Sequence, residues 1–281
     1  MAHPLLDIDT IDEAPEEYLH KIGSVFARFD HTTQDSGNLS YGVEAGDRRF
    51  FVKTAGLPGT GKAFMAHPER VALLRNAVRL NAEVEHAGVP PLYRIVESPA
   101  GPMLVYRWVE GELVRAAAER RGDPQSAYQR FGALPVEERA RAFDTVYEVH
   151  ALLATRGWVA VDLYDGSLIY DFGQKRLYLV DLDHYHKGVF TNAMGRMFGS
   201  TRFMAPEEFE LGATIDQRTT VFTLGRLAAV FMGDGTLDAG TFAGGPALHA
   251  VVARACRPEP RERYTAVADF YTAWQAARQE G

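Results

Sequence analysis

Two acidic residues 19 positions apart, Asp162 and Asp181, constrain this chain more than any other feature. Asp162 follows the apolar stretch GWVAV and Asp181 follows the strand-like run RLYLV, so each carboxylate is expected at the edge of a strand or loop. The run GSTRFMAPEEF (residues 199–209) comes later in the chain. The fold therefore has to place two carboxylates at strand or loop edges, and both precede residues 199–209 in the chain.

Composition and charge narrow the class of protein. The 281 residues suffice for one large domain or two modest lobes, each with its own core. Hydrophobic residues make up 46% and charged residues 24%, which is typical of an ordinary globular protein. The net charge is −7 and no block rich in lysine and arginine occurs, which disfavours a nucleic-acid partner.

The single cysteine, Cys256, excludes an internal disulfide, and its apolar surroundings (VVARAC) predict a buried structural thiol. The acidic beginning, MAHPLLDIDTIDEAPEEY, lacks the basic and apolar regions of a signal peptide. No run of 18 apolar residues occurs, so we expect no membrane span and a cytoplasmic location.

Turn residues divide the front of the chain into strand-like runs. GSVFARFDH, LSYGVEAG and DRRFFVK come first, and Ala45-Gly46-Asp47 is a hairpin signal between the last two. A helical run over residues 68–86 and two further strand-like runs, LYRIVES and MLVYRWVEG, follow. From Leu134 the pattern becomes helical. The expected helices are 134–157, ended by Gly157 as a left-handed cap, then 215–233, 246–257 and 264–277.

These patterns predict an α+β protein of two lobes that meet near residues 108–111. Residues 1–22 form an acidic lead that is either loosely ordered or a short helix. Residues 23–108 form a small β-rich lobe with one main helix, and residues 109–281 form a larger, mostly helical lobe.

The order Asp162, Asp181 and MAPEEF resembles the catalytic half of a protein kinase. The resemblance extends over about residues 23–277 and implies the bilobal protein-kinase-like fold. In that family one carboxylate orients the accepting hydroxyl and another holds Mg²⁺ against the triphosphate of ATP. AVDLYDGS resembles the kinase loop HRDLKPEN, and equally the DLxxGN motif of small-molecule phosphotransferases such as the aminoglycoside and choline kinases.

The resemblance assigns the catalytic aspartate to Asp162 and the metal-binding asparagine position to Ser167, whose hydroxyl can still ligate Mg²⁺. Asp165 lies close enough to help. Asp181 becomes the main metal ligand, and Asp183 is an auxiliary one, as in phosphotransferases that carry IDFD. Four substitutions depart from the kinase pattern: the pair Ala160 and Val161, then Tyr164, Ser167 and Thr220. The missing arginine at Val161 indicates that activation does not depend on capturing a phosphorylated loop.

On the nucleotide side, Lys53 ends the apolar run RRFFVK and resembles the kinase lysine that contacts the phosphates. Gly37, in TTQDSGNLSYGV, stands where the phosphate loop belongs, and Gly42 follows it. Asn76 aligns best with the helix glutamate that pairs with this lysine, and Glu69 and Glu83 are the other candidates. Tyr106 occupies the position that limits pocket depth, and the backbone from Arg107 to Val109 would face the adenine.

Two motifs are expected to be misleading. Asp171-Phe172-Gly173 spells DFG, but it lies only nine residues after Asp162 and suits the turn between SLIY and RLYLV. GLPGTGKA (residues 56–63) fits a P-loop, but Ala63 replaces the hydroxyl residue that holds Mg²⁺ after Lys62. His184 and His186 are interpreted as hydrogen-bonded loop residues. CRPEPRERYTAVADF resembles the closing kinase motif CLxxDPxxRPT, and this resemblance implies that Arg263 pairs with Glu207 or Glu208.

We therefore expect an ATP- and Mg²⁺-dependent phosphotransferase, a serine/threonine protein kinase acting on a protein or peptide hydroxyl. Two other hypotheses stay open. The four substitutions in the kinase pattern favour a pseudokinase, which would bind nucleotide and act as a regulatory module. DLYDGS and VDLD favour a kinase of small molecules. The sequence leaves the acceptor and the oligomeric state undetermined.

Overall fold

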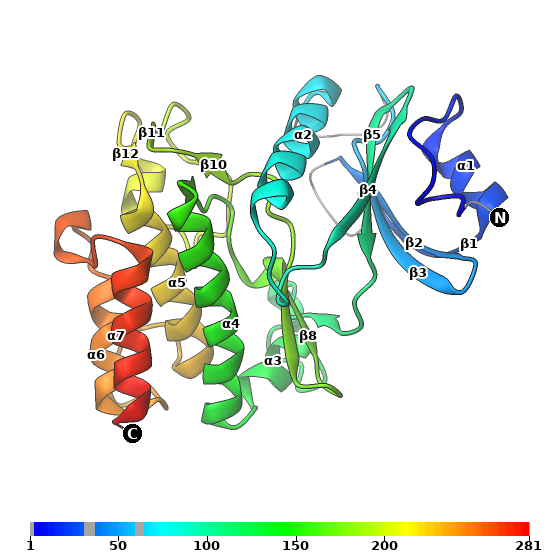
Figure 1. The fold of residues 1–281 in the computed structure, drawn as a ribbon. Coiled ribbons are helices and arrows are strands. Elements are labelled where there is room, and N and C mark those ends of the chain that lie inside the picture. The colour runs from blue at the N-terminus through cyan, green and yellow to red at the C-terminus, as the bar shows by residue number, and fades with distance from the viewer. Residues whose placement is uncertain (1–2, 31–36, 60–64, 281) are drawn as a thin grey trace. The chain divides into compact units, whose positions relative to one another are not determined.

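The computed structural model describes residues 3–30, 37–59 and 65–280, and it is a mixed α+β structure. The chain divides into two compact units. The first comprises Met1–Glu85 and Pro90–Val109, and the second comprises His86–Val89 and Glu110–Gly281. Figure 1 shows the elements of both units.

A five-stranded antiparallel sheet forms the centre of the first unit. Its strands lie in the order β1 (Ser24–Phe29), β2 (Leu39–Ala45), β3 (Arg48–Thr54), β5 (Gly101–Arg107) and β4 (Leu92–Ser98). The predicted hairpin is confirmed: Ala45 pairs with Arg48, and Gly46 turns the chain with a φ of 65°. A positive φ is a conformation that glycine adopts without steric cost.

Helix α2 (His67–Glu83) covers one face of this sheet (Figure 1). Its buried residues Leu74 and Ala77 pack against Leu104 of β5 and Ala55. Because Lys53 lies opposite Leu104 in the ladder, its side chain is on the same face of the sheet as α2. The helix thus covers the side of the sheet that carries the lysine.

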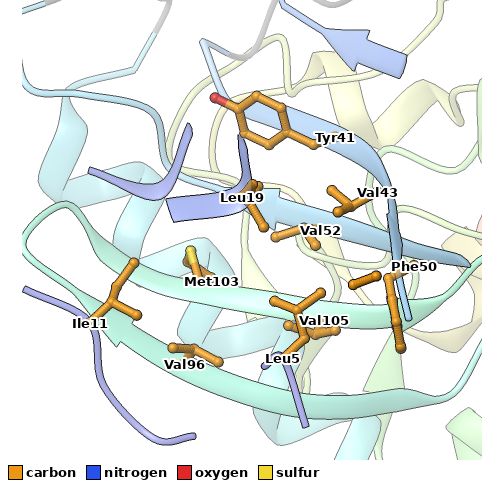
Figure 2. Close-up of a cluster of buried hydrophobic side chains, with 11 residues drawn as sticks. Leu5, Ile11, Leu19, Tyr41, Val43, Phe50, Val52, Val96, Met103 and Val105 are labelled. Carbon is orange, nitrogen blue, oxygen red and sulfur yellow. The ribbon is translucent and has the colours of Figure 1, made fainter. Parts of the chain in front are cut away.

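The N-terminal residues cover the opposite face, as Figure 2 shows. Of the two alternatives for this stretch, the short helix is present as α1 (Pro15–Ile22). Leu5, Ile11 and Leu19 are buried against a cluster from the strands. The strand members of that cluster are Tyr41, Val43, Ala45, Phe50, Val52, Val96, Met103 and Val105.

Backbone hydrogen bonds hold the lead to the sheet edge as well. The N–H of Ile11 donates to the carbonyl of Glu97 at 2.8 Å, and the N–H of Glu97 donates to that of Asp9 at 2.8 Å. The described lead is therefore not loosely ordered. Its few apolar side chains fill a sheet face that would otherwise expose valines and a phenylalanine to water.

The second unit is mainly helical. Its helices are α3 (Ala127–Gly132), α4 (Val136–Thr155), α5 (Gln217–Met232), α6 (Gly245–Ala255) and α7 (Val267–Gln279). Helices α4, α5, α6 and α7 pack on one another (Figure 1). Their interface is aromatic, with Phe143, Tyr147 and Trp274 buried in ring-to-ring contact. Gly157, with φ 78°, ends the α4 region as predicted.

Short strands complete the second unit. β6 (Glu112–Leu113), β8 (Leu168–Asp171) and β9 (Arg176–Leu179) form one sheet. β7 (Trp158–Val159) pairs with β10 (His186–Lys187), and β11 (Phe190–Thr191) pairs with β12 (Thr214–Ile215). Four 3-10 turns are η1 (Ala118–Arg120), η2 (Asp165–Ser167), η3 (Pro206–Phe209) and η4 (Pro260–Glu262). Across the described residues, every helix is too short or too polar to cross a lipid bilayer.

Candidate functional site

Lys53 lies near the end of strand β3 and is only 7% exposed. A lysine on a covered sheet face needs a negative partner to offset the loss of hydration. Of the three candidates on α2, Glu69 is exposed and its Oε2 accepts a hydrogen bond from the backbone N–H of Ala66 at 2.7 Å. Glu69 therefore caps its own helix, while the roles of Asn76 and Glu83 stay predictions.

The two glycines near the predicted phosphate loop differ in structure. Gly37 has a φ of 81°, which suits a tight loop, although the loop residues 31–36 before it lie outside the described part of the chain. Gly42 lies inside β2, where an added Cβ would come within 2.6 Å of the Phe26 ring. Gly42 thus makes room for Phe26. Lys62 of the P-loop-like run also lies outside the described residues.

The expected adenine edge follows β5. Tyr106 belongs to the cluster between α2 and the sheet, and its hydroxyl accepts a long hydrogen bond of 3.4 Å from Asn81. The N–H of Arg107 donates to Pro91 at 3.0 Å, and that of Trp108 donates to Arg49 at 3.3 Å. Within the described chain this leaves the N–H of Val109 as the free donor of the three. The adenine contact of this segment stays a prediction.

In the second unit, Asp162 lies in a loop that we define as residues 160–167, the Asp162 loop. Helix α5 braces this loop because Oγ1 of Thr220 accepts a hydrogen bond of 3.0 Å from the backbone N–H of Ala160. The Ser167 hydroxyl is buried and lies 3.5 Å from both the Asp162 carbonyl and the Tyr164 N–H. These long contacts point the hydroxyl at the loop backbone.

Asp162 and Asp181 share one neighbourhood in the second unit. Burial, and then the charges of Asp162 and Asp181, raise the pKa of Tyr164 to about 12. Burial and the same two charges also raise the pKa of Tyr185 well above its usual value. The charges of both carboxylates thus reach the same two buried tyrosines, and the joint action of Asp162 and Asp181 on one substrate stays a prediction.

Both aspartates have an unusual backbone. The φ angle is 60° at Asp162 and 63° at Asp181, and only Lys175 and Leu237 share a positive value among the described non-glycine residues. Such conformations are uncommon outside glycine, and they concentrate at functional sites where the surroundings hold them in place. Two of the four therefore fall on the predicted catalytic pair.

The acidic residues around Asp181 have different environments. Asp181 is exposed, whereas Asp183 is 3% exposed. Among the described residues, no group of three histidine, cysteine or acidic side chains could hold a metal ion by itself. Mg²⁺ that arrives with a nucleotide needs only one or two protein carboxylates. Asp181 and Asp183 carry carboxylates of that kind, and their role as Mg²⁺ ligands, with Ser167 as a weaker oxygen donor, stays a prediction.

Asp171 takes no part in this cluster. It ends β8, pairs with Arg176 of β9, and its Oδ1 accepts hydrogen bonds of 2.9 Å from the N–H groups of Gly173 and Gln174. This is the side-chain turn that aspartate forms in a hairpin. The literal DFG run is therefore a hairpin turn, as predicted.

Cys256 is buried as predicted, and His186 is hydrogen-bonded as predicted but lies in the short strand β10 and not in a loop. Cys256 is buried, and burial raises the pKa of its thiol to about 12. Ring nitrogen Nδ1 of His186 lies 3.1 Å from the Gly188 carbonyl, and its ring packs on Phe190. Neither residue contributes to a reactive cluster.

The GSTRFMAPEEF run is anchored by a buried ion pair. Arg263 donates to Glu207 through Nη1 at 2.6 Å and through Nη2 at 2.8 Å, and Thr219 donates to the same carboxylate at 2.8 Å. Of the two predicted partners of Arg263, the structure selects Glu207. Glu208 instead accepts a hydrogen bond from Ala205 at 2.7 Å, and burial raises its pKa to about 8.

Sequence reasoning missed two features near the aspartates. The hydroxyl of Tyr185 lies 2.8 Å from Nε2 of His150, whose Nδ1 lies 2.7 Å from the Val146 carbonyl. A carbonyl only accepts, so Nδ1 carries the proton and Tyr185 donates to Nε2. Burial lowers the pKa of His150 to about 4, so the ring is neutral. A histidine on a buried helix face was the available signal.

The second missed feature concerns Asp165, which the sequence suggested as a helper for Mg²⁺. The structure pairs it with Arg202 of the GSTRFMAPEEF run, with Nη1 2.9 Å from Oδ2. Burial raises the pKa of Asp165, and the nearby Arg202 charge opposes that rise. The carboxylate of Asp165 therefore forms an ion pair with Arg202, where the sequence had suggested a contact with Mg²⁺.

Comparisons with known proteins give one distant similarity. No protein-family model matches the chain. The serine/threonine-protein kinase PknG of Mycolicibacterium smegmatis is 25% identical over 249 residues, which is 83% of this chain and 29% of PknG. The chain thus spans less than a third of the length of this curated relative. The similarity supports a protein-kinase-like relationship, with which the α+β architecture and its five-stranded sheet are consistent.

Proposed function

We propose that this chain is an ATP- and Mg²⁺-dependent phosphotransferase, and specifically a serine/threonine protein kinase acting on a protein or peptide hydroxyl. The observation that carries the proposal is the shared neighbourhood of Asp162 and Asp181, both in a left-handed backbone conformation. The distant similarity to a serine/threonine kinase supports the same reaction class.

In this proposal Asp162 accepts the hydrogen bond of the acceptor hydroxyl and takes its proton as the oxygen attacks the γ-phosphorus of ATP. The bond from that phosphorus to the bridging oxygen breaks and ADP leaves. Asp181, with Asp183 and Ser167, would hold Mg²⁺, which neutralises charge on the phosphates. Lys53 would contact the phosphates, Gly37 would line their loop, and Tyr106, Arg107 and Val109 would border the adenine.

The preference for a protein acceptor depends on the 199–209 run. Its buried Glu207–Arg263 pair fixes the end of the run, and in this proposal an extended peptide would bind along it. Gly199 begins this run next to Asp162, since an added Cβ would lie 3.8 Å from Oδ1 of Asp162. A bound peptide could therefore present its hydroxyl to Asp162.

A pseudokinase is the second candidate. The buried Ser167 hydroxyl points at the Asp162 loop backbone, which makes it a poorer metal ligand than the asparagine it replaces. A small-molecule kinase is a third possibility, because DLYDGS also resembles those enzymes. All three bind nucleotide, so binding alone does not separate them.

Purified protein with labelled ATP and Mg²⁺ tests the proposal, with and without Asp181→Asn. We expect wild-type protein to label itself or a mixed protein acceptor, and Asp181→Asn to abolish labelling. ATP binding without transfer to proteins or to small hydroxyl compounds would support the pseudokinase. Transfer to small hydroxyl compounds alone would support the third candidate.

A further inference from the structure

Arg202 connects the GSTRFMAPEEF run to the Asp162 loop. Its Nη1 lies 2.9 Å from Oδ2 of Asp165, which is 2% exposed. Its Nη2 donates to the hydroxyl of Tyr128 on α3 at 2.7 Å. The guanidinium also lies over the rings of Tyr128 and Phe203, 5.2 Å and 4.9 Å from their centroids. One side chain therefore joins three separate parts of the second unit.

The backbone at Arg202 is fixed as well. Nε of Arg226, on α5, donates to the Arg202 carbonyl at 3.0 Å, and Phe203 is fully buried. A planar guanidinium with several donors suits such a junction, because it can satisfy a carboxylate and a hydroxyl at once. The Arg202 side chain and backbone are therefore held by contacts to the Asp162 loop, to α3 and to α5.

An apolar cluster joins the run to the residue that precedes Asp162. Val161 packs with Val159, Met197, Met204 and Ile215. A phosphate group needs cationic or hydrogen-bonding partners, and these side chains provide none. The position before Asp162 is thus unsuited to binding a phosphorylated residue of the run.

We propose that the Asp165–Arg202 ion pair is a built-in positioning device that holds residues 199–206 against the Asp162 loop, so that the acceptor is aligned without phosphorylation of this run. The inference rests on the proposed phosphotransferase function. Asp165 and Arg202 act through the backbone they hold and touch no reacting atom. In this proposal the permanent ion pair holds the run in place, so no added phosphate is needed to hold it.

Four variants separate positioning from general stability. Arg202→Met leaves a buried carboxylate without its cation, and Asp165→Asn removes the charge from the other side. The double variant removes both charges, so it should regain stability relative to Arg202→Met. Arg202→Lys keeps the charge but cannot reach Asp165 and Tyr128 together. Arg278→Gln is the control, because it removes the ion pairs of Arg278 on α7 with the partly buried Asp144 and the exposed Glu137 on α4, which involve neither the run nor the Asp162 loop.

Kinetic measurements distinguish a role of the ion pair in positioning the acceptor from a role in general stability. Misplacing an acceptor by about an ångström can lower a rate roughly 100-fold. We expect Arg202→Met and the double variant to lower kcat/KM for a protein acceptor by roughly 10–100-fold with unchanged ATP affinity. Arg202→Lys should lie between these and wild type, and Arg278→Gln should match wild type. Recovery of transfer together with stability in the double variant would overturn the positioning role.

Amide hydrogen exchange tests whether the Asp165–Arg202 ion pair links residues 199–206 to the Asp162 loop, and it does not require phosphoryl transfer. Arg202→Met should speed amide exchange in residues 195–206, whereas Arg278→Gln should leave this region protected. If both variants exchange alike here, the link is refuted. If wild-type protein transfers no phosphate but the local loosening occurs, the proposed function fails while the link stands. Phosphatase treatment of wild-type protein should leave transfer unchanged, and a loss of transfer would refute independence from phosphorylation.

Discussion

Thr220 on α5 accepts a hydrogen bond through Oγ1 from the backbone N–H of Ala160, at 3.0 Å, two residues before Asp162. Both residues are buried, so water cannot replace this contact. The position departs from the charged residue of the kinase pattern, yet a neutral hydroxyl makes the bracing contact. This one bond ties the backbone of the Asp162 loop to a helix about 60 residues further along the chain.

Replacing Thr220 with valine should test that contact. The change keeps the shape of the side chain but leaves the buried N–H of Ala160 unpaired, which typically costs about 1–3 kcal/mol. Chemical denaturation of wild type, Thr220→Val and Thr220→Ser measures the effect. The serine variant keeps the acceptor and should lose less stability; equal losses for the two variants would show that the methyl group matters instead.

The Glu207–Arg263 pair should be among the most sensitive in the second unit. Arg263 is 2% exposed and Glu207 is 6% exposed, so Glu207→Gln leaves a buried guanidinium without a counter-charge. Breaking such a pair costs about 3–5 kcal/mol. Glu44→Gln, which breaks the exposed pair with Arg49, should cost at most about 1 kcal/mol. Urea titrations compare the two, and similar losses would contradict the assigned importance of burial.

Glu208 should make the protein less stable as the pH rises. Its pKa of about 8 exceeds the ordinary value because of burial, with smaller increases from Glu207 and Asp162 that Arg263 and the Ala205 N–H oppose. Between pH 4.5 and 8 the folded state keeps a proton that the unfolded chain has released, so the free energy of unfolding falls with rising pH.

The slope from Glu208 cannot exceed about 1.4 kcal/mol per pH unit. Measurements at pH 7–8 are cleanest, because His150, with a folded pKa of about 4, is largely neutral there in both states. Glu208→Gln keeps the acceptor oxygen for Ala205 and should flatten the slope. The exposed Glu210→Gln is the control, and an unchanged slope in Glu208→Gln would show that Glu208 is ionised in the folded protein.

Nucleotide binding should separate the assigned residues from the two misleading motifs. ATP with Mg²⁺ at ~100 times its dissociation constant should stabilise the protein by about 2.7 kcal/mol, which a thermal shift detects. Lys53→Ala and Asp181→Asn should reduce that shift, whereas Lys62→Ala and Asp171→Asn should preserve it. The opposite ranking would favour a P-loop site, and no shift in the wild type would remove the nucleotide proposal.

Asp162→Asn should affect the reaction without affecting binding. The carboxylate is proposed to accept the acceptor's proton and to contribute little to ATP affinity, so the thermal shift should persist. Loss of a positioned base typically lowers the rate by about 10²–10⁴. A phosphoryl-transfer assay on wild type and variant decides this, and intact transfer in the variant would show that the loop has been assigned wrongly.

The sequence predicted the features that arise from neighbouring residues. The hairpin at Gly46, the end of the α4 region at Gly157 and the turn at Asp171 all follow from local backbone preferences. The Glu207–Arg263 pair joins residues 56 positions apart, and the resemblance to kinases implied it as one of two alternatives for Arg263. Local preference thus gave the turns and helix ends, and family resemblance gave the candidates for this one distant pair.

Other contacts had no signal in the sequence. Asp165 and Arg202 are 37 positions apart, in a short 3-10 turn and in a loop, where neither charge nor periodicity identifies a partner. His150 and Tyr185 form a similar contact at 35 positions. These side chains need specific partners because they are buried, and their burial is known only from the folded structure.

The docking of the N-terminal lead on the sheet has a practical consequence for dissecting the protein. A shortened chain that begins at Gly23 would keep every strand but lose Leu5, Ile11 and Leu19 from the core they share with Val52 and Val105. The uncovered face would be an exposed apolar patch of the kind that makes proteins aggregate. Fragments and affinity tags are therefore better designed around the first residues than in place of them.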